Sequence, residues 1–257
     1  MKKLNQATRV AMDYDALEEE RRWRQKRPKA GKKQVVLTER HHFPHRLVRS
    51  KLLEALIGPG CTDKSTVIEI GCGSGEDMEF ISQASRNITG VDISPEALNV
   101  YRQQGFRGVL ADAGNLPFAA NSFDYVLYPA ILHHLVGQGN LAPYLKEAAR
   151  LTRQGGYVMA LEPNLFNISG ILMNIFNTVK PGITGLVPHE RALSPLYLIK
   201  IFREAGLKDV KCVSASFTWN RFPLCFSMFI SRHEDSVRHR KPFNLLGWFS
   251  IIWGRKS

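Results

Sequence analysis

The pattern of apolar and polar positions changes character near Ser65. Before this point, residues 44–57 carry apolar side chains at helical spacing, which predicts one helix. The Gly58-Pro59-Gly60 run ends that helix, because glycine and proline both interrupt helical hydrogen bonding. The preceding residues are strongly charged, and residues 14–24 also have helical character. We therefore expect a basic, helical N-terminal extension over residues 1–60.

From Ser65 onwards, short apolar runs alternate with segments of helical character. The runs that predict strands are 66–70, 88–91, 108–111, 123–128 and 157–161. Ser94-Pro95 predicts a helix start, because serine caps helix N-termini and proline suits the first turn. Strands that alternate with helices in this way indicate an α/β fold with a doubly wound, mostly parallel sheet. We expect it over residues 61–257.

The last third of the chain adds two predicted strands, at 208–216 and 248–253, which brings the sheet to seven. We expect the second of them to close the sheet as an edge strand. Two further segments, at about 164–193 and 217–246, are insertions that are too apolar for ordinary surface loops. Basic residues accompany the second insertion, and such a combination suits an element that enters the headgroup region of an anionic membrane.

The net charge of +12 is unevenly distributed along the chain. Residues 1–57 carry a net charge of +8 and residues 208–257 of +6, whereas residues 58–207 carry −2. Basic flanks of this kind suit a nucleic acid or an anionic membrane as partner. The positive charge of the two flanks therefore concerns the surface or partner to which the protein binds. The chemistry of the protein has to be sought in the motifs of the central part of the chain.

Several classes of protein are excluded by composition. No run of about 18 apolar residues is present, so an ordinary transmembrane helix is not expected. The chain has four cysteines and no C-x-x-C pair, which argues against a disulfide scaffold or a zinc knuckle. The histidines His41, His42 and His45 lack partners at metal-binding spacing, and we assign no metal site. The Met1 end lacks the apolar stretch of a secretory signal, so we expect a cytoplasmic protein.

The run Glu69-Ile70-Gly71-Cys72-Gly73-Ser74-Gly75 directly follows the first predicted strand. Glycines at this place let a ligand approach the backbone. Position 76 is Glu, so the G-x-G-x-x-G spacing of a dinucleotide site is absent, and the acidic Glu69 suits an amino group better than a phosphate. Asp92 ends the second predicted strand, where its carboxylate can accept hydrogen bonds from ribose hydroxyls, and Asp112 ends the third.

These motifs resemble those of class I S-adenosylmethionine-dependent methyltransferases, in particular the type 11 group that includes quinone-biosynthesis enzymes. The resemblance covers residues 67–163. It rests on six segments in order: 67–75, Gly90-Val91-Asp92-Ile93-Ser94, Ala111-Asp112-Ala113, Leu116-Pro117-Phe118, Ser122-Phe123-Asp124 and 151–156. It implies the Rossmann-like methyltransferase fold and S-adenosyl-L-methionine as cofactor, with the two insertions over the carboxyl edge of the sheet as a lid or acceptor tunnel.

The resemblance also implies roles for residues near the first two strands. Gly71 and Gly73 would pass beneath the cofactor, and Glu69 would help to bind its methionine end. Asp92 would hold the ribose hydroxyls, and Ile93 would lie against the adenine.

Three further cofactor contacts are implied after the third and fourth strands. Asp112 would accept a hydrogen bond from the adenine amino group, and the backbone amide of Ala113 would donate to the ring. Tyr128, at the end of the fourth strand, would lie near the methyl group. Read only from the residues, the acids of this set could instead cap helices and turns.

Methyl transfer to a hydroxyl or an acidic carbon needs a base. His133 and His134 are the candidates, with His134 preferred, because a neutral imidazole accepts a proton near pH 7. Packing of one ring and backbone hydrogen bonding of the other is the alternative. Glu162-Pro163-Asn164 could bind substrate or simply form a turn. His189-Glu190-Arg191 is polar enough to face a substrate, but a solvated loop is the favoured interpretation.

The acceptor predicted from the apolar insertions is small and apolar or lipid-linked, which would make the protein a cytoplasmic enzyme loosely associated with membranes. An RNA methyltransferase that uses the basic flanks is one alternative. A non-catalytic protein that binds the cofactor as the partner of another enzyme is the other.

Overall fold

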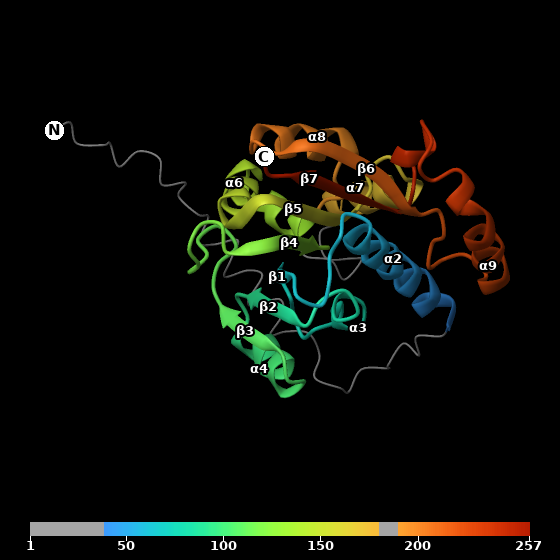
Figure 1. Cartoon of the computed structure of the whole chain (residues 1–257). Helices are drawn as coiled ribbons and strands as arrows, with labels where there is room; N and C mark the ends of the chain where they lie inside the picture. The colour runs from blue at the N-terminus through green and yellow to red at the C-terminus, as the bar shows by residue number, and fades with distance from the viewer. Residues whose placement is uncertain (1–38, 180–189) are drawn as a thin grey trace.

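The computed structural model describes residues 39–179 and 190–257. A seven-stranded sheet forms its centre, with the strand order β3-β2-β1-β4-β5-β7-β6 (Figure 1). All strands run in parallel except β7, which is antiparallel to both neighbours. The strands are β1 (Thr66–Ile70), β2 (Asn87–Asp92), β3 (Arg107–Leu110), β4 (Phe123–Pro129), β5 (Thr152–Pro163), β6 (Lys208–Ser216) and β7 (Phe249–Arg255). The predicted seven-stranded, mostly parallel α/β sheet is confirmed.

The last strand does not lie at an edge, so that prediction was wrong. β7 is inserted between β5 and β6, and β6 is the edge strand. Ile251 and Ile252 point to opposite faces of the sheet, and both are fully buried. An apolar run covered on both faces suits an interior strand as well as an edge strand, so the sequence pattern alone does not distinguish the two positions.

Helices cover both faces of the sheet, as a doubly wound fold requires. They are α2 (Glu39–Ile57), α3 (Met78–Ile81), α4 (Pro95–Gln103), α5 (Leu132–Leu135), α6 (Ala142–Leu151), α7 (Ile168–Val179), α8 (Pro195–Glu204) and α9 (Leu224–His233). One apolar cluster joins α2, α3 and α4 to the sheet, and another joins α5, α6 and α8. Short 3₁₀ turns lie at η2 (Val136–Gln138), η3 (Glu234–Ser236) and η4 (Phe243–Leu245).

The helix starts predicted at serine–proline pairs are present. The Ser94 hydroxyl accepts a hydrogen bond from the Ala97 amide at 3.2 Å, and Pro95 occupies the first turn of α4. Ser194 caps α8 in the same way, through the amide of Tyr197. These caps satisfy amide groups that have no partner within the helix, which fixes where each helix begins.

The N-terminal extension is described only from α2 onwards. This helix packs Val48, Leu52 and Leu56 against the sheet, and all three side chains are buried. The predicted helix near residues 14–24 lies outside the described residues. No helix among the described residues has the length and apolar character needed to cross a bilayer.

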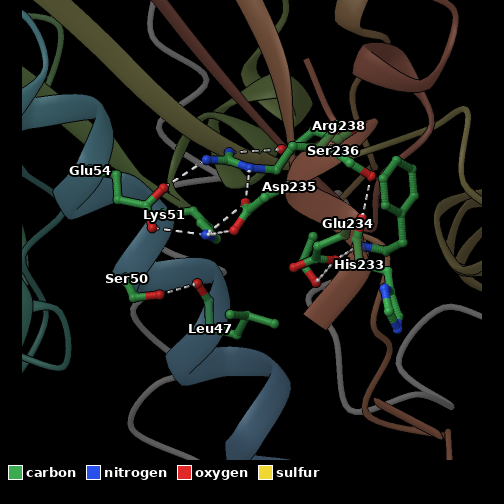
Figure 2. Close-up of polar contacts among 12 residues, drawn as sticks. Leu47, Ser50, Lys51, Glu54, His233, Glu234, Asp235, Ser236 and Arg238 are labelled. Carbon is green, nitrogen blue, oxygen red and sulfur yellow. Dashed lines mark hydrogen bonds and ion pairs between the residues drawn. The ribbon is translucent and has the colours of Figure 1, made fainter. Parts of the chain in front are cut away.

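A network of ion pairs fastens α2 to the segment that follows α9 (Figure 2). The ammonium group of Lys51 lies 2.9 Å from Asp235, and the Arg238 guanidinium lies 2.6 Å from Asp235 and 2.7 Å from Glu54. Next to them, the buried Glu234 carboxylate accepts hydrogen bonds from the Ser216 hydroxyl and the Phe217 amide. The network thus anchors the insertion after β6 on the N-terminal helix.

Candidate functional site

The glycine loop after β1 lies at the carboxyl edge of the sheet. Gly71, Gly73 and Gly75 all have positive φ, at +75°, +52° and +96°. The amides of Gly71 and Cys72 both donate to the Val91 carbonyl oxygen, which ties the loop to β2. A Cβ atom at Gly71 would lie only 2.6 Å from the Ile131 side chain. Glycine is therefore required at position 71 by backbone conformation and by space together.

Glu69 is a fully buried carboxyl group on β1, just before this loop. Its Oε2 atom has the Tyr101 hydroxyl at 3.5 Å, while its Oε1 atom is buried without a hydrogen-bond partner among the described residues. Burial raises the pKa of Glu69 well above its usual range, and the neighbouring acids Asp77 and Glu76 add to the effect. An unsatisfied buried carboxylate oxygen suits a cationic ligand group, such as an ammonium.

Asp92 ends β2 and connects the glycine loop to the start of α4. Its Oδ2 atom accepts from the Gly73 amide at 2.9 Å, and its Oδ1 atom accepts from the Ser94 amide at 2.8 Å. Each carboxylate oxygen has a second lone pair, so the group can still accept from a ligand hydroxyl. Ile93, the next residue, is partly exposed. Glu69, Gly71, Gly73 and Asp92 thus lie together, as the sequence predicted.

Asp112 and Ala113 follow β3 at the same edge. The Asp112 carboxylate accepts from the Gly114 amide at 2.6 Å and is partly exposed, whereas Ala113 is buried. Asp112 therefore holds a turn, and its partial exposure leaves it accessible to a ligand.

Tyr128 lies at the end of β4, but its ring points into the core. The side chain is fully buried, and its hydroxyl donates to the Tyr144 carbonyl oxygen on α6 at 2.8 Å. Burial raises the pKa of this phenol far above its usual range. Because successive side chains of a strand alternate between faces, Tyr128 is directed to the α6 face. Tyr128 could therefore contact a cofactor only through its main-chain atoms.

His133 lies in α5, after β4, and is held by Glu162 at the end of β5. The Nδ1 atom of His133 is 2.8 Å from Oε2 of Glu162. The same carboxylate accepts from the amides of Ile131, Leu132 and His133. Burial raises the pKa of Glu162 to about 8, although these amide hydrogen bonds oppose the shift.

The neighbouring Asn164 also has a structural role. Its side-chain amide donates to the carbonyl oxygens of Leu245 and Gly247, and its Oδ1 atom accepts from the Phe166 amide. The sequence allowed two roles for Glu162-Pro163-Asn164, substrate binding or a turn. Within the described residues, the contacts of Glu162 and Asn164 are with other parts of the protein.

His134, the other candidate base, contacts Glu190. The Nδ1 atom of His134 lies 2.9 Å from Oε1 of Glu190, and the two imidazole rings of His133 and His134 are 4.2 Å apart between centroids. Glu190 is only 2% exposed. The expectation that it belongs to a solvated loop was therefore wrong. Asn177 of α7 donates to the Glu190 carbonyl oxygen at 2.9 Å, which holds this residue inside the structure. His189 lies outside the described residues.

The same three side chains could hold a metal ion. One donor atom each from His133, His134 and Glu190 lie within 4.8 Å of one another. Two imidazoles and a carboxylate are ligands that zinc and similar cations prefer, and the bond from Glu162 would orient the His133 ring. The sequence missed this grouping because Glu190 is remote from the histidines along the chain.

A cavity of about 710 Å³ lies elsewhere, between α2 and the strands β5, β6 and β7. Among the residues that line it are Lys51, Glu54 and Arg238, which are paired with one another or with Asp235. Tyr157 and Arg255 place it toward the amino end of β5, away from the glycine loop. We therefore place the candidate site at the carboxyl edge, where Glu69, Asp92 and the two histidines lie.

Comparison with known proteins identifies a methyltransferase domain in this chain. Residues 68–160 match a family described as a methyltransferase domain. A tRNA (carboxymethyluridine(34)-5-O)-methyltransferase of Xenopus tropicalis is 32% identical over 102 residues, 38% of this chain and 16% of that protein. The demethylmenaquinone methyltransferase of Tropheryma whipplei is 30% identical over 107 residues, 40% of this chain and 44% of that protein. The matched region thus covers less than half the length of both relatives.

The fold is shared with solved structures over nearly the whole chain. A crystal structure of a SAM-dependent methyltransferase of Thermotoga maritima, described as a possible histamine N-methyltransferase, has a TM-score of 0.64 at 20% identity. The match covers 94% of this chain and 96% of that one. The chain thus contains a methyltransferase domain at residues 68–160 and has the fold of class I S-adenosylmethionine-dependent methyltransferases, whose cofactor is S-adenosylmethionine.

Proposed function

We propose that this protein transfers a methyl group from S-adenosylmethionine to a small acceptor that is apolar or lipid-linked. The observation that carries the proposal is the pairing of two features at one sheet edge. On one side lies the glycine loop, preceded by Glu69 with a buried oxygen that has no hydrogen-bond partner among the described residues. On the other side lies His134, whose Nδ1 atom is 2.9 Å from the buried Glu190 carboxylate. The first suits a cationic cofactor, and the second suits removal of a proton.

The residues present fit S-adenosylmethionine. Within residues 39–179 and 190–257, Glu69 offers a buried oxygen without a hydrogen-bond partner, and Gly71 and Gly73 keep the backbone free of side chains. Asp92 would accept hydrogen bonds from the ribose hydroxyls and Asp112 from the adenine amino group, and Ile93 and the Ala113 amide would serve the adenine ring. When bound, the cofactor supplies an electrophilic sulfonium methyl group. The contribution of the chain is to position the two reactants and to exclude water.

His134 is the residue we propose as general base. The Glu190 carboxylate lies 2.9 Å from the Nδ1 atom of this histidine, and an imidazole beside a carboxylate can take up a proton near pH 7. A buried carboxylate stabilises the imidazolium that forms when the ring takes a proton, as an orienting acid does in other base-catalysed reactions. An arrangement of this kind suits an acceptor with a hydroxyl or an acidic C–H, since these lose a proton during methylation.

The nature of the acceptor is inferred from the elements beside the site. Asn177 of α7 contacts the Glu190 backbone, and α7 contains no charged residue. The outward side of α7 carries exposed apolar residues such as Ile171 and Ile175, so an acceptor that reaches this edge along the surface of the helix meets apolar side chains. This supports an apolar or lipid-linked molecule, and the similarity to a demethylmenaquinone methyltransferase agrees with it.

RNA is the second candidate acceptor, because one relative is named as a tRNA methyltransferase and the chain carries a net charge of +12. A single assay separates the candidates. Labelled S-adenosylmethionine is incubated with the full chain and, in separate reactions, with lipid, RNA and small-metabolite fractions of the source cell.

We expect label in the lipid or small-metabolite fraction, and its loss in the His134→Ala variant. Label confined to RNA would establish the second candidate. Absence of label from every fraction, with cofactor binding intact, would support a non-catalytic cofactor-binding partner instead.

A further inference from the structure

Helix α7 packs its polar side against the protein and exposes its apolar side. Its inward residues are Gly170, Asn174 and Asn177, and the two asparagines hydrogen-bond the backbone of Ala192 and Glu190. Its outward residues include Ile168 and Ile175, which are 56% and 51% exposed. A surface helix normally buries its apolar side. The polar side of α7 is the packed one, so its apolar side is left without a partner in the described chain.

Helix α9 shows the same inversion. Ser227 is its buried residue, whereas Phe226 and Phe229 are 47% and 60% exposed. Large aromatic side chains are rarely left facing water in neighbouring positions, and an exposed apolar patch usually marks an interaction site.

Both helices lie at the same edge of the sheet. α7 follows β5 and α9 follows β6, and these strands are parallel because both are antiparallel to β7. The segment that leads into β7 connects them. Asn167 donates to the Leu246 carbonyl oxygen at 3.1 Å, and the ring of the exposed Phe243 contacts Phe217, which is itself bonded to Glu234 after α9. We name this region the α7–α9 surface; it comprises Ile168, Ile171, Ile175, Phe226, Phe229 and Phe243.

The charges near this surface have one sign. Arg221, Arg232, Arg240 and Lys241 are exposed, and none of them forms an ion pair within the described residues. The two acidic residues of the same insertion already have partners inside the protein. Glu234 is buried, and Asp235 is bonded to Lys51 and Arg238 (Figure 2). An anionic partner therefore meets only unpaired positive charges here.

We propose that the α7–α9 surface docks on an anionic lipid bilayer, with its aromatic and aliphatic side chains in the headgroup boundary and the four basic residues on acidic lipid headgroups. Burial of the apolar side chains and attraction of the basic residues to an anionic surface both favour binding. The ion-pair network between α2 and η3 holds the base of α9, which keeps the surface in a fixed orientation.

A second copy of the chain is a poorer partner for this surface. In a two-fold symmetric dimer the same patch meets itself, so the basic residues of one subunit would face those of the other. A bilayer of anionic lipid instead neutralises them. The inference rests on the proposed function only in that docking would bring a lipid-linked acceptor to the edge that carries His134; bilayer binding itself needs no methyl transfer.

Vesicle flotation tests the inference on the full chain. Vesicles of neutral phosphatidylcholine are compared with vesicles that contain about one third phosphatidylglycerol, at low and at about 0.5 M salt. We expect the protein to float with the anionic vesicles at low salt and less at high salt. Phe226→Ser combined with Phe229→Ser should lower the partition coefficient at least tenfold, and Arg240→Ala combined with Lys241→Ala should weaken binding to anionic vesicles specifically.

Val100→Ser is the matched control. Val100 is an exposed apolar residue on α4, far along the sheet from α9 (Figure 1), and its replacement should leave flotation unchanged. Circular dichroism and calorimetric binding of S-adenosylhomocysteine show that each variant is folded. Failure of the wild type to float, or equal flotation of the Phe226→Ser/Phe229→Ser variant, would overturn the inference.

The same measurements separate this inference from the proposed function. Absent flotation with intact S-adenosylhomocysteine binding refutes only the bilayer inference, and flotation without S-adenosylhomocysteine binding refutes only the methyltransferase proposal. A dimer that light scattering detects in the wild type and not in the Phe226→Ser/Phe229→Ser variant, without flotation, would assign the surface to self-association.

Discussion

The imidazole of His134 lies 2.9 Å from the carboxylate of Glu190, although His134 precedes strand β5 in the sequence and Glu190 follows it. Glu190 is buried, and its backbone is held by Asn177. The carboxylate is therefore a positioning group for the ring that we propose as base.

Replacement of either residue should affect methyl transfer more than cofactor binding. His134→Ala should slow transfer by about 10²–10⁴-fold, the usual contribution of a general base. Glu190→Gln should slow it less and move the acidic limb of the pH–rate profile to lower pH, because a neutral amide no longer favours the imidazolium. Rates measured on the acceptor fraction identified by label transfer, with S-adenosylhomocysteine binding as control, check both. An unchanged pH profile in Glu190→Gln would leave Glu190 with a structural role only.

Gly71 should not tolerate even the smallest side chain. A Cβ atom there combines a positive φ with a 2.6 Å contact to Ile131, so Gly71→Ala should destabilise the fold by about 2–4 kcal/mol. Gly105 also has a positive φ, of +87°, but has open space around it. Gly105→Ala should cost about 1 kcal/mol or less after the entropy gain in the unfolded chain.

Urea denaturation of both variants separates strain from steric overlap. If the overlap is real, adding Ile131→Ala to Gly71→Ala should cost less than the two single changes together, with a coupling of about 1–2 kcal/mol. Equal losses at Gly71 and Gly105 would show that Ile131 plays no part.

Much of the cofactor side of the site could be predicted from the sequence because it is local. The glycine loop, Glu69 and Asp92 each follow directly from a strand end, and parallel strands bring their carboxyl ends to one edge. The partner of His134 could not be predicted in this way. Glu190 lies in an irregular segment that contacts of α7 and a hydrogen bond from the Arg191 amide to the His133 carbonyl oxygen bring to the histidines.

Two other differences also have a physical origin. The family resemblance implied that Tyr128 lies near the transferred methyl group, but strand alternation directs its ring to α6. The position of β7 inside the sheet depends on which strands pair, and apolar patterning does not encode pairing partners.

Glu162 should make stability depend on pH. Its pKa rises from 4.5 to about 8 on folding, chiefly because of burial. The folded protein thus keeps a proton that the unfolded chain has released, so this contribution to stability is lost as pH rises from about 4.5 to about 8. Glu162→Gln removes the titration. The melting temperature of the variant minus that of the wild type should become more positive between about pH 5.5 and pH 8.5.

Glu147 provides the control for this pH dependence. Burial acts to raise the pKa of Glu147, but hydrogen bonds from Arg150 and from the Leu116 amide outweigh it and lower the pKa. Its contribution is therefore lost only as pH falls below the usual range of a carboxyl group, and Glu147→Gln should show no slope over the same interval. A flat difference for Glu162→Gln as well would mean that Glu162 stays ionised in the fold.

The ion pairs between α2 and η3 should contribute to stability more than an ordinary surface pair. The Arg238 side chain is 7% exposed and contacts both Glu54 and Asp235, so Arg238→Ala should cost about 1–3 kcal/mol. Lys200 and Glu204 form an exposed pair at 3.8 Å, and Lys200→Ala should cost at most about 0.5 kcal/mol. Urea denaturation of the two variants gives the comparison, and equal costs would contradict the anchoring role of Arg238.

Calorimetric titration with S-adenosylhomocysteine tests the central claim most directly. The wild type should bind it, and Asp92→Ala should weaken binding at least about tenfold, or about 1.4 kcal/mol, because the carboxylate both supports the glycine loop and accepts from the ligand. Asp63→Ala, which changes an exposed acid before β1, should bind like the wild type. Absence of binding by the wild type, or unchanged affinity in a folded Asp92→Ala variant, would contradict the account.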